Sequence, residues 1–286
     1  MTHFSLKRTL QSSLLSTYSL AYENGGKSPE KALAIPDNLS LSGTSIRKIT
    51  QACHRQKLVK KTSNTENITY TSAILRKLSR SFSEPIASVA EGYARFLNRQ
   101  AAFTAVPMFE VSSDTNGMVI FTILGQGVLA WRQRLESWPL TGQPAVTSAS
   151  PLAATVFSPG DLWQLQSAYE WCCRCCRCWR QQSQPCESGS SPPEMGRLPY
   201  DVPTSGAALI HLMVELCDAW EELSPAQLRR YGLQLAEAAA DTSRLFTLGE
   251  LSQGEAPTMG AWLESARSLL GHLLLDRLGL LPVRRF

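Results

Sequence analysis

Apolar side chains in the second half of the chain recur at the three-to-four-residue spacing of amphipathic helices. The spacing predicts helices over residues 162–182, 207–222, 225–245 and 257–280. Ser224-Pro225-Ala226-Gln227 forms a capping box with proline at the first helical position, which marks one of these starts. Because four apolar stripes can enclose one core, residues 161–286 are predicted to form an α-helical bundle.

The first half of the chain mixes helical and alternating patterns. Helical spacing predicts helices over residues 45–57, 70–82, 85–97 and 126–137. Two short alternating apolar runs, 106–112 and 118–124, flank Asp114-Thr115-Asn116-Gly117. Asn-Gly accepts the positive backbone angles of a tight turn, so these runs predict a β-hairpin. Residues 45–137 are therefore expected to form a small α/β domain in a mainly α-helical protein.

Three stretches lack a strong pattern. Residues 138–160 and 183–205 are rich in proline, glycine and small polar residues, and they predict a linker and a loop within the helical domain. Residues 1–44 are rich in serine and asparagine, and they are expected to form a weakly ordered segment with short helices at most. The expected organisation is thus an N-terminal segment, an α/β domain (45–137), a linker (138–160) and a helical domain (161–286).

Composition narrows the class of protein. In 286 residues, no window reaches the roughly 18 consecutive apolar residues of a membrane helix, and the N-terminus lacks a secretory signal pattern. A soluble cytoplasmic protein without a membrane partner is expected. An organellar leader stays open, because the serine- and leucine-rich start has no acidic residue before Glu23.

Charge is unevenly distributed along the chain. Residues 1–100 carry 15 Lys and Arg against 6 Asp and Glu, whereas residues 101–286 carry 13 against 18. A basic first third favours a polyanionic partner such as nucleic acid. An ordinary solvated surface explains the same charge equally well.

Six of the eight cysteines lie between Cys172 and Cys186. Cys172, Cys175 and Cys178 have the C-x2-C-x2-C spacing of metal ligands, with Cys186 as a fourth. On one continuous helix, however, these three side chains rotate around the axis, which opposes a shared ion. We therefore expect no metal. The interpretation favoured here is that Cys172, Cys173 and Cys176 are core residues, while Arg174, Arg177 and Arg180 form a solvent-facing stripe.

The helical half resembles a known family. Residues 225–238, with Leu228, Arg230, Tyr231, Leu235 and Ala238, resemble the central helix of the DALR anticodon-binding domain of arginyl-tRNA synthetases. Residues 278–286 are similar to that family's last helix and tail, with Phe286 where the family usually has methionine. Residues 165–172 resemble its opening helix, with Trp171 in place of an arginine. The resemblance implies a DALR-type helical fold that contacts tRNA.

The first half has a weaker resemblance to the additional N-terminal domain of the same synthetases. Tyr70-Thr71-Ser72 and the following residues, then Glu84-Pro85-Ile86, are similar to that domain's tyrosine-containing helix and its proline-started helix. A full synthetase has a nucleotide-binding fold with a His-x-Gly-His motif and a Lys-Met-Ser-Lys-type loop between the two domains. Here 23 residues separate them, no histidines have that spacing, and no lysine follows Lys77. The resemblance implies a protein without the catalytic domain.

No other catalytic motif is evident, and the pairs His211–Glu215 and His272–Asp276 have the spacing of helix-surface contacts. We expect a non-catalytic protein without cofactor or small-molecule substrate that binds tRNA or another structured RNA. A protein-interaction subunit that retained the bundle, and a trans-acting part of arginyl-tRNA aminoacylation, remain alternatives. The candidate RNA-binding residues are cations and aromatic rings: Arg229, Arg230, Tyr231, Arg284, Arg285, Phe286, Tyr70, Arg76 and Lys77.

Overall fold

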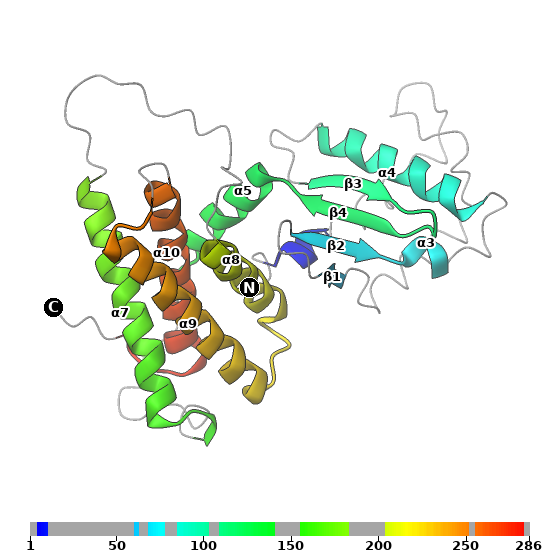
Figure 1. The fold of residues 1–286 in the computed structure, drawn as a ribbon. Helices are drawn as coiled ribbons and strands as arrows, with labels where there is room; N and C mark the ends of the chain where they lie inside the picture. The colour runs from blue at the N-terminus through cyan, green and yellow to red at the C-terminus, as the bar shows by residue number, and fades with distance from the viewer. Residues whose placement is uncertain are drawn as a thin grey trace, which may run out of the picture. The chain divides into compact units, whose positions relative to one another are not determined.

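The computed structural model describes residues 5–10, 60–62, 68–77, 85–102, 109–140, 155–182, 204–251 and 255–282. The chain divides into two compact units, Met1–Ala130 and Trp131–Phe286 (Figure 1). The division falls inside helix α5 (Gly125–Glu136), whereas the sequence pattern placed this helix wholly in the first domain. The helix predicted over 45–57 and most of the predicted linker and loop lie outside the described residues.

The first unit contains a four-stranded antiparallel sheet in the order β1-β2-β4-β3. The strands are β1 (Lys60–Thr62), β2 (Thr69–Ser72), β3 (Phe109–Ser113) and β4 (Val119–Ile123). Tyr70 pairs with Phe121, which in turn pairs with Val111, and all three side chains are buried. This row forms the centre of the unit's core. Residues 6–10 add one helical turn whose Leu6 and Leu10 are buried.

The predicted hairpin is confirmed by β3 and β4. The Asp114 carboxylate accepts hydrogen bonds from the backbone N–H groups of Asn116 and Met118, at 2.9 and 2.8 Å. Gly117 has a φ of 76°, in the region that favours glycine. Only Gly117 adopts the positive backbone angle that the Asn-Gly pair predicts, because Asn116 has no positive φ, and the Gly117 N–H closes the turn by donating to the Asp114 carbonyl at 3.1 Å.

The proline-started helix is also confirmed, as α4 (Ile86–Ala102), which packs along β3 in Figure 1. Its buried residues include Val89, Tyr93 and Leu97. The Asn98 side chain donates to the Val111 carbonyl at 2.7 Å and accepts from the Val111 N–H at 2.8 Å. Both backbone groups of Val111 on the open side of edge strand β3 are thereby satisfied.

The helix predicted over 70–82 is wrong at its start. Residues 69–72 form strand β2, Ile74–Lys77 form the short helix α3, and residues 78–82 lie outside the described part of the chain. Ile68, Tyr70 and Ser72 are buried while Thr69 and Thr71 are partly exposed, which is the two-residue period of a strand. Threonine and tyrosine favour strands, and pairing with β4 outweighs the short helical spacing that follows. The tyrosine-containing helix implied by the N-terminal resemblance is therefore absent at these residues.

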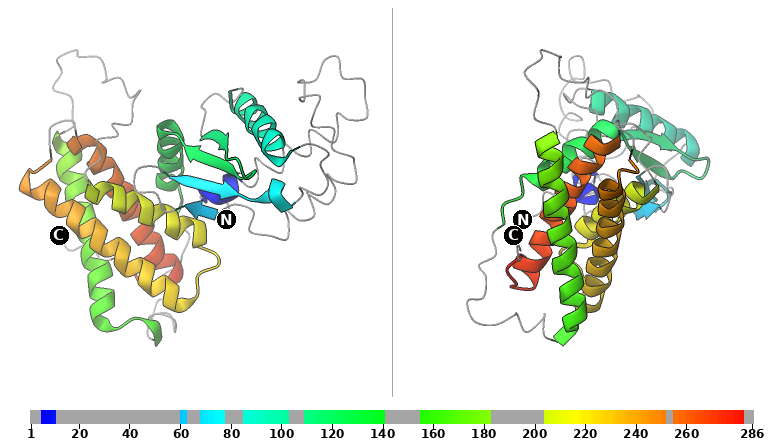
Figure 2. Two further views of the ribbon diagram at one scale, coloured as in Figure 1. Left: turned by 45° about the vertical axis from the view of Figure 1, so that its right-hand side comes forward. Right: turned by 60° about the vertical axis from the view of Figure 1, so that its left-hand side comes forward.

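The second unit is helical, and the four predicted helices are confirmed with shifted ends. They are α7 (Pro159–Gln182), α8 (Thr204–Ala219), α9 (Pro225–Leu248) and α10 (Glu255–His272), and α10 continues into the π-helical turn η2 (Leu273–Arg277). Figures 1 and 2 show them packed side by side as a bundle. Among the described residues, none of the helices combines the length and apolar character that crossing a bilayer requires.

Local signals explain where α7 and α9 begin. The Ser224 side chain accepts from the Gln227 N–H, and the Gln227 side chain accepts from the Ser224 N–H, which is the predicted capping box. At α7, Ser158 and Asp161 exchange the same pair of bonds, at 2.8 and 3.2 Å. Gly249, with a φ of 70°, ends α9 in the left-handed conformation.

The bundle core consists of aliphatic, aromatic and cysteine side chains. Among the fully or almost fully buried residues are Leu165, Cys172, Leu209, Met213, Leu216, Leu228, Leu235, Trp262, Leu263, Leu269, Leu270, Leu273, Leu274 and Leu278. The predicted stripes of α9 and α10 are thus confirmed as core. Tyr231 and Ala238 of the same helix α9 are only half-buried.

His272 differs from its predicted place on the helix surface, because it is fully buried. The predicted pairing with Asp276 is present, at 2.6 Å from Nδ1 to the carboxylate. The other ring nitrogen lies 3.3 Å from the Trp138 carbonyl oxygen, and the Trp138 ring stacks on the imidazole with 3.9 Å between centroids. This cluster fixes the residues that follow α5 against α10.

Candidate nucleic-acid interface

Helices α7 and α9 begin at the same end of the bundle. Arg229 of α9 contacts Asp161 of α7, and farther along Cys175 of α7 contacts the backbone of Ser243 of α9. Both pairs are 68 residues apart, so the two helices run parallel and in register. The partly positive N-terminal ends of two helices therefore lie together, an arrangement that favours anions.

Arg229, at this end of the bundle, forms an ion pair within the protein. Its guanidinium donates two hydrogen bonds to Asp161, at 2.8 Å from Nε and 3.2 Å from a terminal nitrogen. Asp161 lies on a different helix, 68 residues away in the chain. The Arg229 hydrogen bond, followed by that from the Ser158 N–H, lowers the pKa of Asp161 to about 2. Part of the Arg229 charge is thus neutralised by the fold itself.

The lowered pKa predicts how stability depends on acid. A carboxylate with a depressed folded-state pKa stabilises the protein above its unfolded pKa, near 4, and that contribution is lost as the pH falls toward 2. We expect Asp161→Asn to lower the thermal midpoint at pH 6. The difference from wild type should shrink between about pH 4 and about pH 2. Thermal unfolding across that range measures it, and a difference that does not change with pH would contradict the assignment.

Arg230 and Tyr231 form an exposed cation–ring pair beside Arg229. The Arg230 guanidinium lies 4.9 Å from the centroid of the Tyr231 ring. Arg230 is exposed and Tyr231 is half-buried, and among the described residues no carboxylate pairs with Arg230. The guanidinium is therefore available to a phosphate, and the ring edge is available to a base.

Trp163 of α7 lies one turn into its helix, level with the start of α9, and 67% of its side chain is exposed. The candidate residues identified from the sequence did not include it. A signal was present, because Trp163 falls outside the apolar stripe formed by Leu165, Tyr169 and Cys172. Its exposed ring offers a surface on which an unpaired base could stack.

The other predicted site residues are placed differently. Tyr70 is 0% exposed in β2, so its ring offers no surface for stacking. Arg76 is exposed on α3, and Lys77 is the last residue of that helix. Tyr70, Arg76 and Lys77 belong to the first unit, whereas Arg229 and Arg230 belong to the second. Arg284, Arg285 and Phe286 lie outside the described residues.

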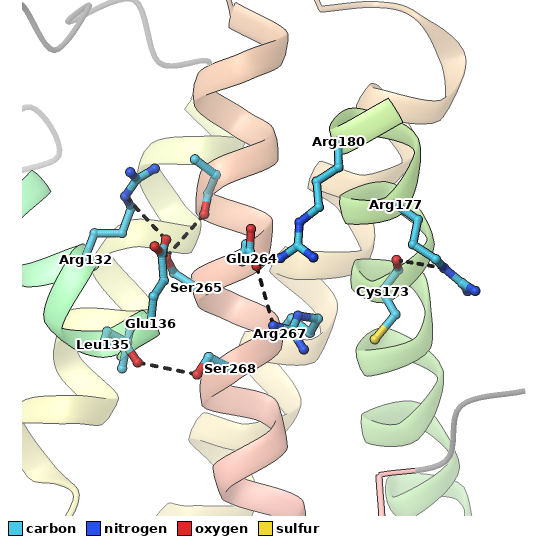
Figure 3. A network of polar contacts seen from close by, with 11 residues as sticks. Arg132, Leu135, Glu136, Cys173, Arg177, Arg180, Glu264, Ser265, Arg267 and Ser268 are labelled. Atoms are coloured by element: carbon cyan, nitrogen blue, oxygen red, sulfur yellow. Dashed lines mark hydrogen bonds and ion pairs between the residues drawn. The ribbon is translucent and has the colours of Figure 1, made fainter. Parts of the chain in front are cut away.

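Two of the three arginines on α7 have a carboxylate partner. Arg174 bonds to Glu170 at 2.5 Å. Arg180 bonds to Glu264 of α10, which also lies 3.6 Å from Arg267 (Figure 3). Arg177, whose Nε donates to the Cys173 carbonyl at 3.4 Å, has no carboxylate partner among the described residues. The predicted arginine stripe is exposed as expected.

Figure 3 also shows how the end of α5 is tied to α10. The Glu136 carboxylate accepts from the Ser265 hydroxyl at 2.9 Å and lies 3.5 Å from Arg132. The Ser268 hydroxyl donates to the Leu135 carbonyl at 3.4 Å. These contacts stabilise the bundle, and they involve no residue at the end where α7 and α9 begin.

The cysteine-rich part of α7 is mainly core. Cys172 and Cys176 are buried as predicted, Cys175 is buried as well, and Cys178 is exposed. Cys173, predicted to be core, is only partly buried. In the part of the chain that the structure describes, no three His, Cys, Asp or Glu side chains are placed to hold a metal ion. Cys186, the proposed fourth ligand, lies outside that part.

Burial predicts which thiols react. It raises the pKa of Cys172 well above the usual value, and burial together with the nearby Glu264 carboxylate raises the pKa of Cys176 to about 12. Because the thiolate is the nucleophile, we expect iodoacetamide to modify Cys178 in the folded protein and to modify Cys172 and Cys176 only after denaturation. Peptide mass spectrometry measures this order. Equal labelling of Cys172 and Cys178 in the folded protein would contradict it.

No family model, curated protein or solved structure matches the chain.

Proposed function

We propose that this chain is a non-catalytic protein related to arginyl-tRNA synthetases, and that it binds tRNA or a tRNA-like RNA at the end of the bundle where α7 and α9 begin. The resemblance of residues 225–238 to a DALR anticodon-binding helix supports the proposal, because it places Arg230 and Tyr231 at that end. The single observation that carries it is the exposed Arg230–Tyr231 pair, which has no carboxylate partner among the described residues.

The chemistry of this end suits an RNA loop. Unpaired bases stack on aromatic side chains, and each such contact contributes about 1–3 kcal/mol. Phosphates accept hydrogen bonds from arginine and are favoured at helix N-termini. Asp161 already neutralises Arg229, so Arg230 is the cation at this end that we expect to contact a phosphate.

The charge of the bundle limits how salt-sensitive the binding is. Residues 131–286 carry 13 Lys and Arg against 16 Asp and Glu, so no broad positive field surrounds the unit. The number of phosphates neutralised here should be small, which gives a shallow dependence of affinity on salt. Any steeper dependence of the RNA affinity on salt is expected to come from residues 1–130, which carry 15 Lys and Arg against 8 Asp and Glu.

Net negative charge favours one other candidate function. A protein-interaction subunit that retained the bundle without binding RNA needs no positive surface, and the paired arginines on α7 are compatible with it. It does not account for Arg230, which has no carboxylate partner among the described residues and lies beside the half-buried Tyr231 ring. The two functions differ in whether tRNA binds at low salt.

The test is binding of labelled tRNA to the full chain across a salt series. We expect Arg230→Ala to weaken binding about five- to tenfold and to reduce the salt slope by about one. Arg244→Ala is the matched control, because Arg244 is an exposed arginine of the same helix that pairs with Asp241. The control should bind like wild type.

Two results would overturn the proposal. Absence of tRNA binding at low salt would favour the protein-interaction subunit. Amino-acid-dependent pyrophosphate exchange by the purified chain would show catalysis.

A further inference from the structure

The outward face of α7 carries two exposed tryptophans, Trp163 and Trp171, with 67% and 44% of their side chains accessible. They are eight residues apart, which is about 12 Å along a helix that rises 1.5 Å per residue. Both lie away from the core side of α7, where Leu165, Cys172 and Cys176 are buried. Neither ring is part of the bundle core, and both present accessible surface to a ligand.

Polar and positively charged side chains surround these rings. Arg174 lies with its guanidinium 5.6 Å from the centroid of the Trp171 ring, and Arg177 is exposed one turn farther along. The acidic residues closest in sequence to the two rings, Asp161 and Glu170, are already bonded to Arg229 and Arg174. This face therefore offers aromatic rings to an apolar planar group and arginine to an anion.

We propose that this outward α7 face binds an unpaired RNA strand, with bases stacked on Trp163 and Trp171 and a phosphate held by Arg177, which has no carboxylate partner among the described residues. The inference rests on the proposed function and specifies its ligand as single-stranded rather than duplex RNA. Stacked bases are 3.4 Å apart, so rings about 12 Å apart hold bases that are not neighbours. Paired bases inside an A-form duplex do not present their faces to such rings.

A protein partner fits this face less well. Protein interfaces have an apolar centre that excludes water around their tryptophan and arginine hot spots. Between and beside the two rings, α7 presents the polar residues Gln164, Ser167 and Glu170. Isolated rings in polar surroundings are typical of single-stranded nucleic-acid surfaces, where each base stacks separately.

The experiment measures the anisotropy of a fluorescent 12-nucleotide uridine strand and of a 12-base-pair RNA duplex with the full chain. We expect the strand to bind more tightly than the duplex, and Trp163→Ala or Trp171→Ala to weaken strand binding about tenfold each. Trp163→Phe and Trp171→Phe keep a ring and should retain most of the affinity. Leu248→Ala is the matched control, because Leu248 is 69% exposed but lies on α9.

The outcomes separate this inference from the proposed function. If tRNA binds and Arg230→Ala weakens it, but both tryptophan variants bind the strand like wild type, the α7 inference is overturned and the proposed function stands. Equal affinity for duplex and strand also overturns it. Loss of a co-purifying protein in the tryptophan variants, with strand binding intact, assigns the face to a protein partner. If neither tRNA nor the strand binds, both proposals fail.

Discussion

Replacing Trp262 with alanine is expected to lower the free energy of unfolding of the helical unit by about 3–5 kcal/mol. Trp262 is 0% exposed in α10, and its ring lies 6.4 Å from the Trp131 ring, between centroids. The Arg132 guanidinium lies 5.8 Å from the same ring. The Trp262 indole N–H has no hydrogen-bond partner in the described structure. The substitution therefore removes packing contacts rather than a hydrogen bond, and it leaves a large cavity.

Urea unfolding followed by circular dichroism at 222 nm measures this loss. Trp163→Ala is the matched control, because it removes the same side chain from a largely exposed position of the same unit and should change stability by about 0.5 kcal/mol at most. Similar costs for the two variants would show that Trp262 is not at the centre of the core.

Gly260→Ala is expected to destabilise the protein by about 1–3 kcal/mol, although alanine favours helices by about 1 kcal/mol over glycine. A Cβ atom at Gly260 would lie 2.7, 2.9 and 3.0 Å from three atoms of the Trp179 ring. A ring moves as a rigid group, so α7 and α10 must separate to admit the methyl group. Overpacking therefore outweighs the gain in helix propensity.

Gly271 of the same helix, unlike Gly260, has room for a methyl group. A Cβ there would lie 3.4 Å from the Tyr169 ring, which is an ordinary contact. We expect Gly271→Ala to be neutral or to stabilise the protein by up to about 1 kcal/mol. Thermal unfolding of the two variants measures the difference. Equal effects would contradict the close approach of Gly260 to Trp179.

Local signals made much of the fold predictable. The capping box at Ser224 and the Asn116-Gly117 turn act through bonds within a few residues, so the sequence shows both partners. The buried stripe of α10 could be predicted because helical spacing determines which residues share a face. Strand β2 could not, because Tyr70 is buried by pairing with Phe121, 51 residues away.

The candidate interface was predictable only in part. Arg230 and Tyr231 were identified on their helix, but the partner of Arg229 was not, because Asp161 is brought to it by the parallel packing of α7 and α9. The boundary between the two units, which falls inside α5, was not predicted for a similar reason. The periodicity of Trp131 and Leu135 indicates that they are buried, but not which unit buries them.

The central claim is that the α7–α9 end of the bundle contacts RNA, and photo-crosslinking of tRNA to the full chain tests it most directly. With 4-thiouridine-substituted tRNA and mass spectrometry of the crosslinked peptides, we expect crosslinks at Trp163 and Tyr231, and we expect them to be reduced in Arg230→Ala. Crosslinks confined to residues 1–130, or none above those of a denatured control, would contradict the claim.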